Sequence, residues 1–291
     1  MRRFLPLLAL LGSLALLGGC SRLDLLYEHF DRLATWRIDR YLDLDREQKD
    51  WLRPRLQEHL AWHCRAQLPQ LADWLQHDSA ALADGRLDGG NLGRRIDALE
   101  QELQLGASQL APTVAGLLAR LDAQQVQHLR RKLAEEQQKL TREFLAPPLD
   151  EQIARRKQTT EERLERWFGP LNAQQQALVG DWAQRRGQHN RLWLDSRERW
   201  QQALLESLAE RDSEGFEARI GHLMAHRQQY WSEAYRESFA NGQRELVELL
   251  QDLLASSDAR QRAYLQEQLN GLREDIVSLP CATPAAAVAN R

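Results

Sequence analysis

A short phrase recurs four times along the chain and places a helix start at each copy. Each copy is Asp or Asn, two further residues and then Gln, and three of the four copies follow a leucine. The first side chain can accept a hydrogen bond from the third backbone N–H of a helix, while Gln reaches back to the cap N–H. We therefore expect structural helix caps at four positions: Asp45, Asp122, Asn172 and Asp258.

The composition extends this expectation to the whole chain. Leu, Ala, Gln, Glu and Arg dominate, β-branched residues are scarce, and no stretch alternates apolar and polar residues as a strand does. The predicted fold class is all-α, an elongated multi-helix body.

The helix starts also pair into an internal duplication. Trp51 and Trp62 are eleven residues apart, as are Trp182 and Trp193, which places each pair on one helical stripe. We predict two related four-helix units, with chance similarity among Leu- and Gln-rich helices as the alternative. Prolines and glycines delimit the segments: a first unit at 44–148, a linking helix at 149–170 and a second unit at 171–279. A glycine cluster at 85–93 is read as a loop between helices.

The first nineteen residues have the zones of a bacterial signal peptide. Arg2 and Arg3 precede an apolar run at 4–17, which is too short to cross a bilayer core as a helix. The run Leu17-Gly18-Gly19-Cys20 resembles the lipobox of bacterial lipoproteins, which implies lipidation of Cys20 after removal of 1–19. A lipid anchor at the membrane and a place in the cell envelope follow from that resemblance. Ser21, in place of Asp, implies the outer membrane, facing the periplasm.

The two ends of the mature chain have different patterns. Residues 20–43 are predicted to contain an amphipathic helix, and residues 280–291 a disordered tail. The helix carries an apolar stripe that we expect to pack on the body, with lipid contact as the alternative: Leu23, Leu26, Tyr27, Phe30, Leu33, Ile38 and Tyr41.

The net charge limits the classes of binding partner, and the cysteine count predicts a disulfide. Loss of 1–19 removes two arginines and no acids, which changes the net charge from −3 to −5 and argues against nucleic acid as a partner. Cys64 and Cys281 form an even pair, which an oxidising periplasm would join in a disulfide; two free, partly buried thiols are the alternative.

Candidate chemistry is sparse. His59 and His63, like His222 and His226, are four residues apart and can share a metal, although we favour surface or packing roles for both pairs. The sequence has no nucleophile elbow, phosphate-binding glycine loop or zinc-protease motif, so we predict no enzyme and no cofactor. Trp182, Trp193 and Trp200 lie at helical spacing and are predicted core residues, with a binding groove as the alternative.

The chain resembles, over its whole length but mainly in residues 17–75, an uncharacterised family of proteobacterial lipoproteins, domain of unknown function family 6279. The residues that carry the resemblance are Ser21-Arg22-Leu23, Tyr27, Trp36, Tyr41-Leu42-Asp43-Leu44-Asp45, Gln48, His59-Leu60-Ala61-Trp62-His63 and Leu68-Pro69. It implies a lipoprotein body with no established activity. The recurring phrase is also similar to the Leu-Thr-x-x-Gln boxes of small periplasmic chaperones, although Asp or Asn replaces Thr here.

These observations lead to one functional expectation and one alternative. We expect a non-enzymatic envelope protein whose helical body binds another polypeptide, as a scaffold, adaptor or chaperone. The alternative is a periplasmic metal-binding lipoprotein that uses the paired histidines.

Overall fold

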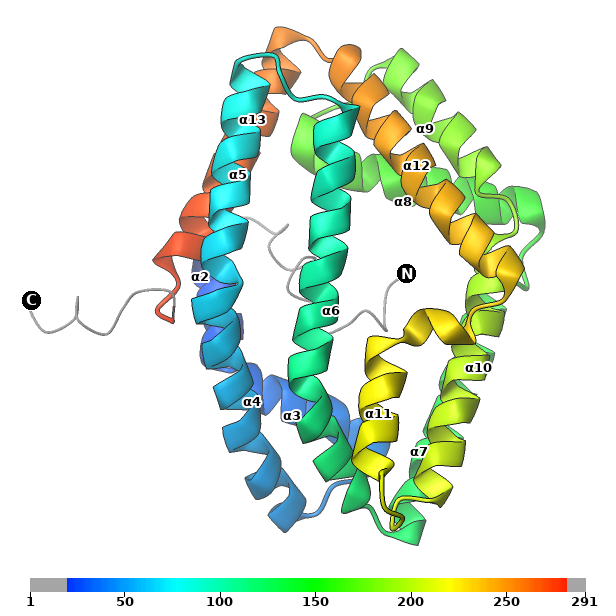
Figure 1. The fold of residues 1–291 in the computed structure, drawn as a ribbon. Coiled ribbons are helices and arrows are strands. Elements are labelled where there is room, and N and C mark those ends of the chain that lie inside the picture. Colours follow the sequence, from blue (N-terminus) through cyan, green and yellow to red (C-terminus); the bar gives the residue numbers. More distant parts are fainter. Residues whose placement is uncertain (1–19, 282–291) are drawn as a thin grey trace, which may run out of the picture. The chain divides into compact units, whose positions relative to one another are not determined.

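The structure is a computed structural model that describes residues 20–281, with the backbone alone for residues 20–22. The predicted signal peptide, the side chain of Cys20 with its predicted lipid and residues 282–291 of the predicted tail lie outside the described part. Within it the chain is helical and has no β-strand, which confirms the predicted all-α class (Figure 1). The elements are α2 (Cys20–Glu28), α3 (Phe30–Leu42), α4 (Arg46–Ala66), α5 (Leu68–Ala83), α6 (Gly89–Ala119), α7 (Ala123–Phe144), α8 (Leu149–Phe168), α9 (Ala173–Arg185), α10 (His189–Ala209), α11 (Phe216–Ala225), η1 (Arg227–Tyr230), α12 (Glu233–Ala255) and α13 (Ala259–Ser278).

Three helices begin with the complete capping box that the recurring phrase predicts. Asp45, Asp122 and Asn172 each accept from the backbone N–H three residues later, at 2.8 to 2.9 Å. In each case the Gln side chain accepts from the cap N–H in return. Asp258 makes only the first of these bonds, to the N–H of Gln261, whose amide instead donates to the Pro170 carbonyl.

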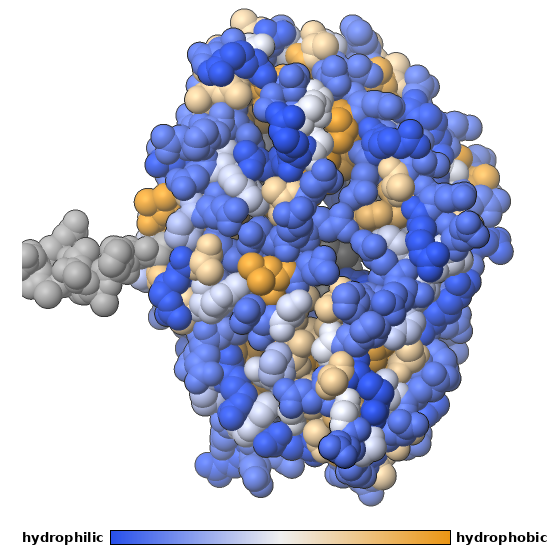
Figure 2. All heavy atoms as spheres, in the orientation of Figure 1, coloured by the Kyte–Doolittle hydropathy of each residue, from blue (hydrophilic) through white to orange (hydrophobic). Residues whose placement is uncertain are grey.

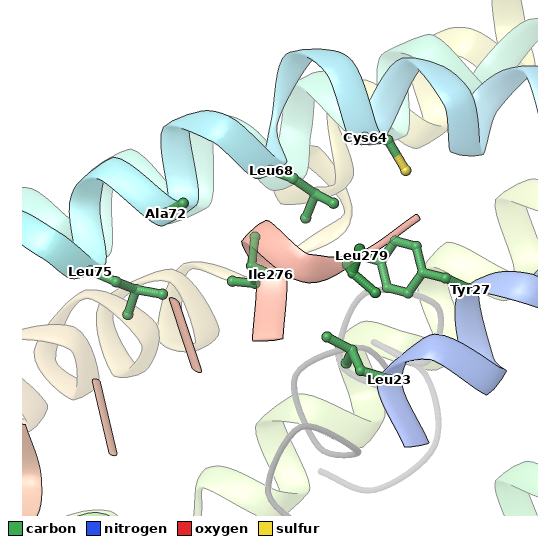
Figure 3. Packing of buried hydrophobic residues seen from close by; sticks show 8 residues of the cluster. All are labelled: Leu23, Tyr27, Cys64, Leu68, Ala72, Leu75, Ile276 and Leu279. Atoms are coloured by element: carbon green, nitrogen blue, oxygen red, sulfur yellow. The ribbon is translucent and has the colours of Figure 1, made fainter. Parts of the chain in front are cut away.

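The first compact unit contains residues 20–40, 44–87 and 262–281, so it joins both ends of the described chain. Its core is a cluster in which side chains of α2, α4, α5 and the end of α13 converge (Figure 3): Leu23, Tyr27, Cys64, Leu68, Ala72, Leu75, Ile276 and Leu279. A disulfide joins Cys64 to Cys281, 217 residues away, with the two Cα atoms 5.8 Å apart. Cys281 therefore belongs to the folded unit and not to the predicted tail.

The second unit contains residues 41–43 and 88–261. In it α6 packs on α11 and α12, and α10 packs on α7, α11 and α12. Helix α9 contacts both α8 and α12. Buried apolar side chains at the helix contacts form its interior, among them Val179, Leu194, Leu208, Ile220 and Leu253.

The compact units do not follow the predicted boundaries at 44–148 and 171–279. Helix α13, assigned by sequence to the second half, packs from Arg262 onward with α2, α4 and α5. The cause is the apolar cluster around Leu279 together with the disulfide, which hold the C-terminal segment to the N-terminal helices. The proposed duplication remains a prediction about sequence.

The glycine-rich segment is shorter as a loop than predicted. Asp88 caps α6 by accepting from the N–H of Asn91 at 2.8 Å, so the glycines from Gly89 onward are helical. A Cβ at Gly89 would lie 2.2 Å from Oε1 of Gln251 in α12. A side chain at this position would require the Gln251 side chain to move, and only Gly85, at φ +66°, serves the turn itself.

The surface agrees with the highly charged composition. Hydrophilic residues dominate the face shown in Figure 2, with hydrophobic residues in small groups. Among residues 20–281, no helix is both long enough and apolar enough to span a bilayer.

Candidate functional site

The first predicted histidine pair is engaged inside the first unit. His63 lies 2.7 Å from Oε1 of Gln67 through Nδ1 and 3.0 Å from the Tyr27 hydroxyl through Nε2. Because Oε1 is an acceptor, Nδ1 carries the proton and Nε2 accepts from the hydroxyl. Burial raises the pKa of Tyr27 above its usual range, which keeps that donor protonated. Both ring nitrogens of His63 therefore have hydrogen-bond partners within the protein.

His59, the other member, packs its ring 5.4 Å from that of Trp62. Burial, helped by the neighbouring His63, lowers the pKa of His59 to about 4, so the ring is neutral at physiological pH. His59 thus contributes packing, and the hydrogen bonds of His63 connect Tyr27 of α2 to Gln67 at the end of α4.

The second pair lies together at the end of α11. The rings of His222 and His226 are 4.5 Å apart, and Nε2 of His222 is 2.7 Å from Oε1 of Gln229. Across residues 20–281, no group of three or more His, Cys, Asp or Glu side chains is placed to hold a metal ion. The structure brings these two histidines together and already gives one of them a protein partner.

The tryptophans predicted as core residues are half-buried and contact protein. Trp193 packs edge-on against Phe144, with ring centres 5.8 Å apart. The indole N–H of Trp200 donates to the Leu223 carbonyl at 2.9 Å, and the indole nitrogen of Trp182 is buried. Trp193 and Trp200 thus connect α10 to α7 and to α11.

A polar network that the sequence analysis did not find joins α8, α9, α10 and α12. Arg156 donates to the Ala183 and Gly187 carbonyls at 2.9 and 3.3 Å, which satisfies the C-terminal end of α9. Arg186 donates to the Ser238 carbonyl at 2.8 Å and to Nδ1 of His189 at 2.6 Å. Arg156, the 183–189 segment and Ser238 lie far apart in the chain, and no local spacing relates these three parts.

The electrostatics of this network favour a structural role. Burial, together with Arg186 and Arg156, lowers the pKa of His189 to about 3. A neutral His189 accepts from the Arg186 guanidinium, so the basic nitrogen near the Ser238 hydroxyl, at 3.3 Å, is already engaged. Ser238 and His189 therefore do not form a nucleophile and base pair of the kind that hydrolases use.

The best candidate for a binding site is an open groove on the second unit, between α8 and α9. It has a volume of about 670 Å³. Leu149, Ile153 and Ala154 of α8 supply its apolar wall, and Gly180 of α9 lines the other side. Leu149 is 43% exposed, which places it among the exposed large hydrophobic residues of the described chain. We call this feature the α8–α9 groove.

Local sequence explains how the groove forms. Pro148 precedes α8, and its extended backbone directs the chain into the first turn, where Asp150 complements the helix dipole. Helix α9 begins at the Asn172 capping box, and Gly180 lies two turns further on. Opposite Gly180 stands the Lys157 side chain, whose Cε is 3.6 Å from the position of an added Cβ.

Charged groups surround the apolar wall. The exposed carboxyl groups of Asp150 and Asp181 lie at the rim, while Lys157 forms an ion pair with Glu161 at 3.6 Å. The rim therefore favours a ligand that combines an apolar group with positive charge. Sequence reasoning missed the groove because its two walls come from separate helices, one of them assigned only as a linker.

Comparison with known proteins gives one match. No curated protein and no solved structure matches the chain significantly. A family model described as a family of unknown function, DUF6279, matches residues 40–236. That match covers most of the chain and confirms the family that the N-terminal motifs predict. The chain belongs to the DUF6279 family of unknown function.

Proposed function

We propose that this protein is a lipid-anchored envelope protein that binds another polypeptide through the α8–α9 groove, as a scaffold, adaptor or chaperone. The observation that carries the proposal is the exposed apolar wall formed by Leu149, Ile153 and Ala154, opposite Gly180. An exposed leucine beside a hollow is a favourable contact for an apolar side chain of a partner.

The form of the groove favours a polypeptide over a small molecule. Sites for small molecules bury most of their ligand's surface in a concave pocket. The α8–α9 groove is open, and helical walls suit a helical or extended segment that lies along them. With Asp150 and Asp181 at the rim, the favoured partner segment carries an apolar side chain flanked by Lys or Arg.

The envelope location rests on the sequence of the leader. Arg2 and Arg3, the short apolar run and Cys20 together support export and lipidation, and Ser21 supports sorting to the outer membrane. Helix α2 begins at Cys20, so an acyl group there would hold the folded body close to the bilayer.

Site-directed photocrosslinking tests the groove. A photoreactive phenylalanine analogue at Ala154 lies in the groove, and the same analogue at Glu162 of α8 lies outside its lining. In intact cells we expect a discrete crosslinked polypeptide from position 154 and none of comparable yield from position 162. Replacing Asp150 and Asp181 by Lys should reduce the crosslink at least several-fold because the rim charge is reversed.

Two outcomes would contradict the groove as the binding site. One is equal crosslinking from both positions, which indicates nonspecific collision. The other is a crosslink from position 154 that persists unchanged after Asp150→Lys and Asp181→Lys, with Glu162→Lys and Glu165→Lys together as the charge-matched control.

The anchor has an independent test. Cys20→Ser should abolish the mass increment from acyl chains and release the protein from the membrane fraction after cell breakage. An unmodified mass for the wild-type mature protein would refute the lipid anchor without bearing on the groove.

A further inference from the structure

Two helices next to the proposed lipid anchor present an exposed face with both apolar and basic side chains. Helices α2 and α3 continue through His29, whose N–H donates to the Leu25 carbonyl at 3.1 Å and whose carbonyl accepts from Leu33 at 3.0 Å. Residues three and four apart share a side of such a helix. The outer face, as we call it, consists of Leu25, His29, Arg32, Leu33, Trp36 and Arg40.

This face is separate from the one that packs on the protein. Leu23 and Tyr27 of α2 are 7% exposed and point into the apolar cluster of the first unit (Figure 3). In contrast Leu25 is 53% exposed, Leu33 44% and Trp36 58%. The predicted stripe thus packs mainly on the body, but Leu33 belongs to the outer face. A tryptophan and two leucines on one outward side are more than scattered surface residues require.

Most of the charged groups on this face are positive. Arg40 lies with its guanidinium 5.4 Å from the centre of the Trp36 ring, and Arg32 donates to His29 at 2.8 Å. Nearby carboxylates bind groups of the body: Asp31 accepts from Gln57, and Asp39 forms an ion pair with Lys49 at 2.9 Å. Arginines therefore outnumber carboxylates at the outer face, where Glu28 at its border is exposed.

This combination has the chemistry of a membrane interface. Tryptophan is enriched at the level of lipid headgroups because its ring is apolar and its N–H is polar. Arginine can bury its aliphatic stem while its guanidinium stays with phosphate groups. An amphipathic helix with these residues on one side binds in the plane of the interface.

The position along the chain selects a bilayer as the occupant. Helix α2 starts at Cys20, so Leu25 lies about 8 Å and Trp36 about 24 Å further along the helix axis, at 1.5 Å per residue. A helix that lies flat beside its own anchor can bring the whole outer face into contact with headgroups. We propose that Leu25, Leu33, Trp36, Arg32 and Arg40 form a docking surface for an anionic lipid bilayer. This inference extends the lipid anchor of the proposed function, but it concerns the protein surface and can be tested without the lipid.

Vesicle binding by the unlipidated protein tests the docking surface. The full mature chain with Cys20→Ser is sedimented with vesicles of phosphatidylcholine alone or with one third phosphatidylglycerol. We expect binding to the anionic vesicles that weakens at high salt, because surface charges are screened. Leu25→Ala, Leu33→Ala and Trp36→Ala together should weaken it by at least about tenfold, since three apolar side chains leave the interface.

A matched control separates this face from general hydrophobicity. Leu99→Ala, Leu105→Ala and Tyr264→Ala remove two exposed leucines and one exposed aromatic ring elsewhere, and should leave vesicle binding unchanged. An environment-sensitive dye on Leu25→Cys should move to shorter emission wavelength on anionic vesicles, whereas the same dye on Leu105→Cys should not. Circular dichroism and melting temperature of each variant establish that it is folded.

Three results would overturn the proposal. The first is that the Cys20→Ser protein with its outer face unchanged binds neither kind of vesicle. The second is equal loss of binding in the two triple variants. The third is self-association of the Cys20→Ser protein, measured by sedimentation, that disappears with Trp36→Ala, because the face would then contact a second copy of the chain.

Discussion

The buried amide pair of Gln175 and Gln261 offers a sharp test of how the helix caps are tied into the second unit. Gln175 is 0% exposed, and Gln261 is 8% exposed. Each amide donates to the other's Oε1, at 3.1 and 2.9 Å, and Gln175 also accepts from the Asn172 N–H at 3.0 Å. Gln261 further donates to the Pro170 carbonyl. The pair therefore joins the start of α9 to the start of α13.

Replacing one partner should cost much more than a surface mutation. Gln175→Leu leaves Oε1 of Gln261 and one of its amide hydrogens without their partners in a buried place. An orphaned buried polar group costs about 1–3 kcal/mol, so we expect the free energy of unfolding to fall by about 2–4 kcal/mol. Gln174→Leu, the same substitution at the exposed neighbour, should change it by less than about 0.5 kcal/mol.

The double variant distinguishes pairing from packing. With Gln175→Leu and Gln261→Leu together, no buried amide is left, and the Asn172 N–H and Pro170 carbonyl lie at an exposed helix start where water can bind them. The double loss should be smaller than the sum of the single losses by at least about 1 kcal/mol. Urea unfolding followed by circular dichroism at constant disulfide oxidation measures the wild type, the single variants Gln175→Leu, Gln261→Leu and Gln174→Leu, and the double variant. Strictly additive losses, or a Gln175→Leu loss no larger than that of Gln174→Leu, would refute the reasoning.

Four further predictions use the same unfolding assay. Asp122→Ala should lower the free energy of unfolding by about 0.5–2 kcal/mol and Asp122→Gly by less, because Gly is tolerated at an N-cap; the reverse order would contradict a capping role. Reduction of the Cys64–Cys281 disulfide should lower it by up to about 5 kcal/mol, and a Cys64→Ser and Cys281→Ser variant should no longer respond to reductant. His189 has a pKa of about 3 in the folded protein, below its unfolded value of about 6.5, so the unfolded chain alone gains its proton as pH falls between these values. Between these two pH values, His189 should lower the free energy of unfolding by at most about 1.4 kcal/mol for each pH unit of acidification. If His189→Asn leaves this pH dependence unchanged, His189 is not its source. Gly242→Ala should be destabilising because its Cβ would lie 2.2 Å from Nη1 of Arg186, whereas Gly221→Ala, with no atom within 4 Å, should be neutral or stabilising by up to about 1 kcal/mol.

Local signals in the sequence determine where helices begin. Asp45, Asp122 and Asn172 can be identified as caps without a structure because both partners of a capping box lie within four residues. The scarcity of β-branched residues and the lack of alternation identify the all-α class for the same reason, since helical hydrogen bonds are local. The break before α5 follows from Pro69, which occupies the first turn of that helix.

Tertiary packing decides which helices belong together and which side of each stays exposed. No pattern in the sequence places α13 beside α2, α4 and α5, because that arrangement rests on contacts between residues more than 180 positions apart, such as Ser79 and Asn270. The hydrogen bonds from Arg156 to Ala183 and from Arg186 to Ser238, like the α8–α9 groove, join groups from separate helices. The apolar stripe of α2 and α3 predicts that Leu23 and Tyr27 face inward, but it also includes Leu33, which only the tertiary structure leaves exposed. A helix in contact with the core on one side must present its other side to the surroundings, and packing decides where the boundary between the two sides lies.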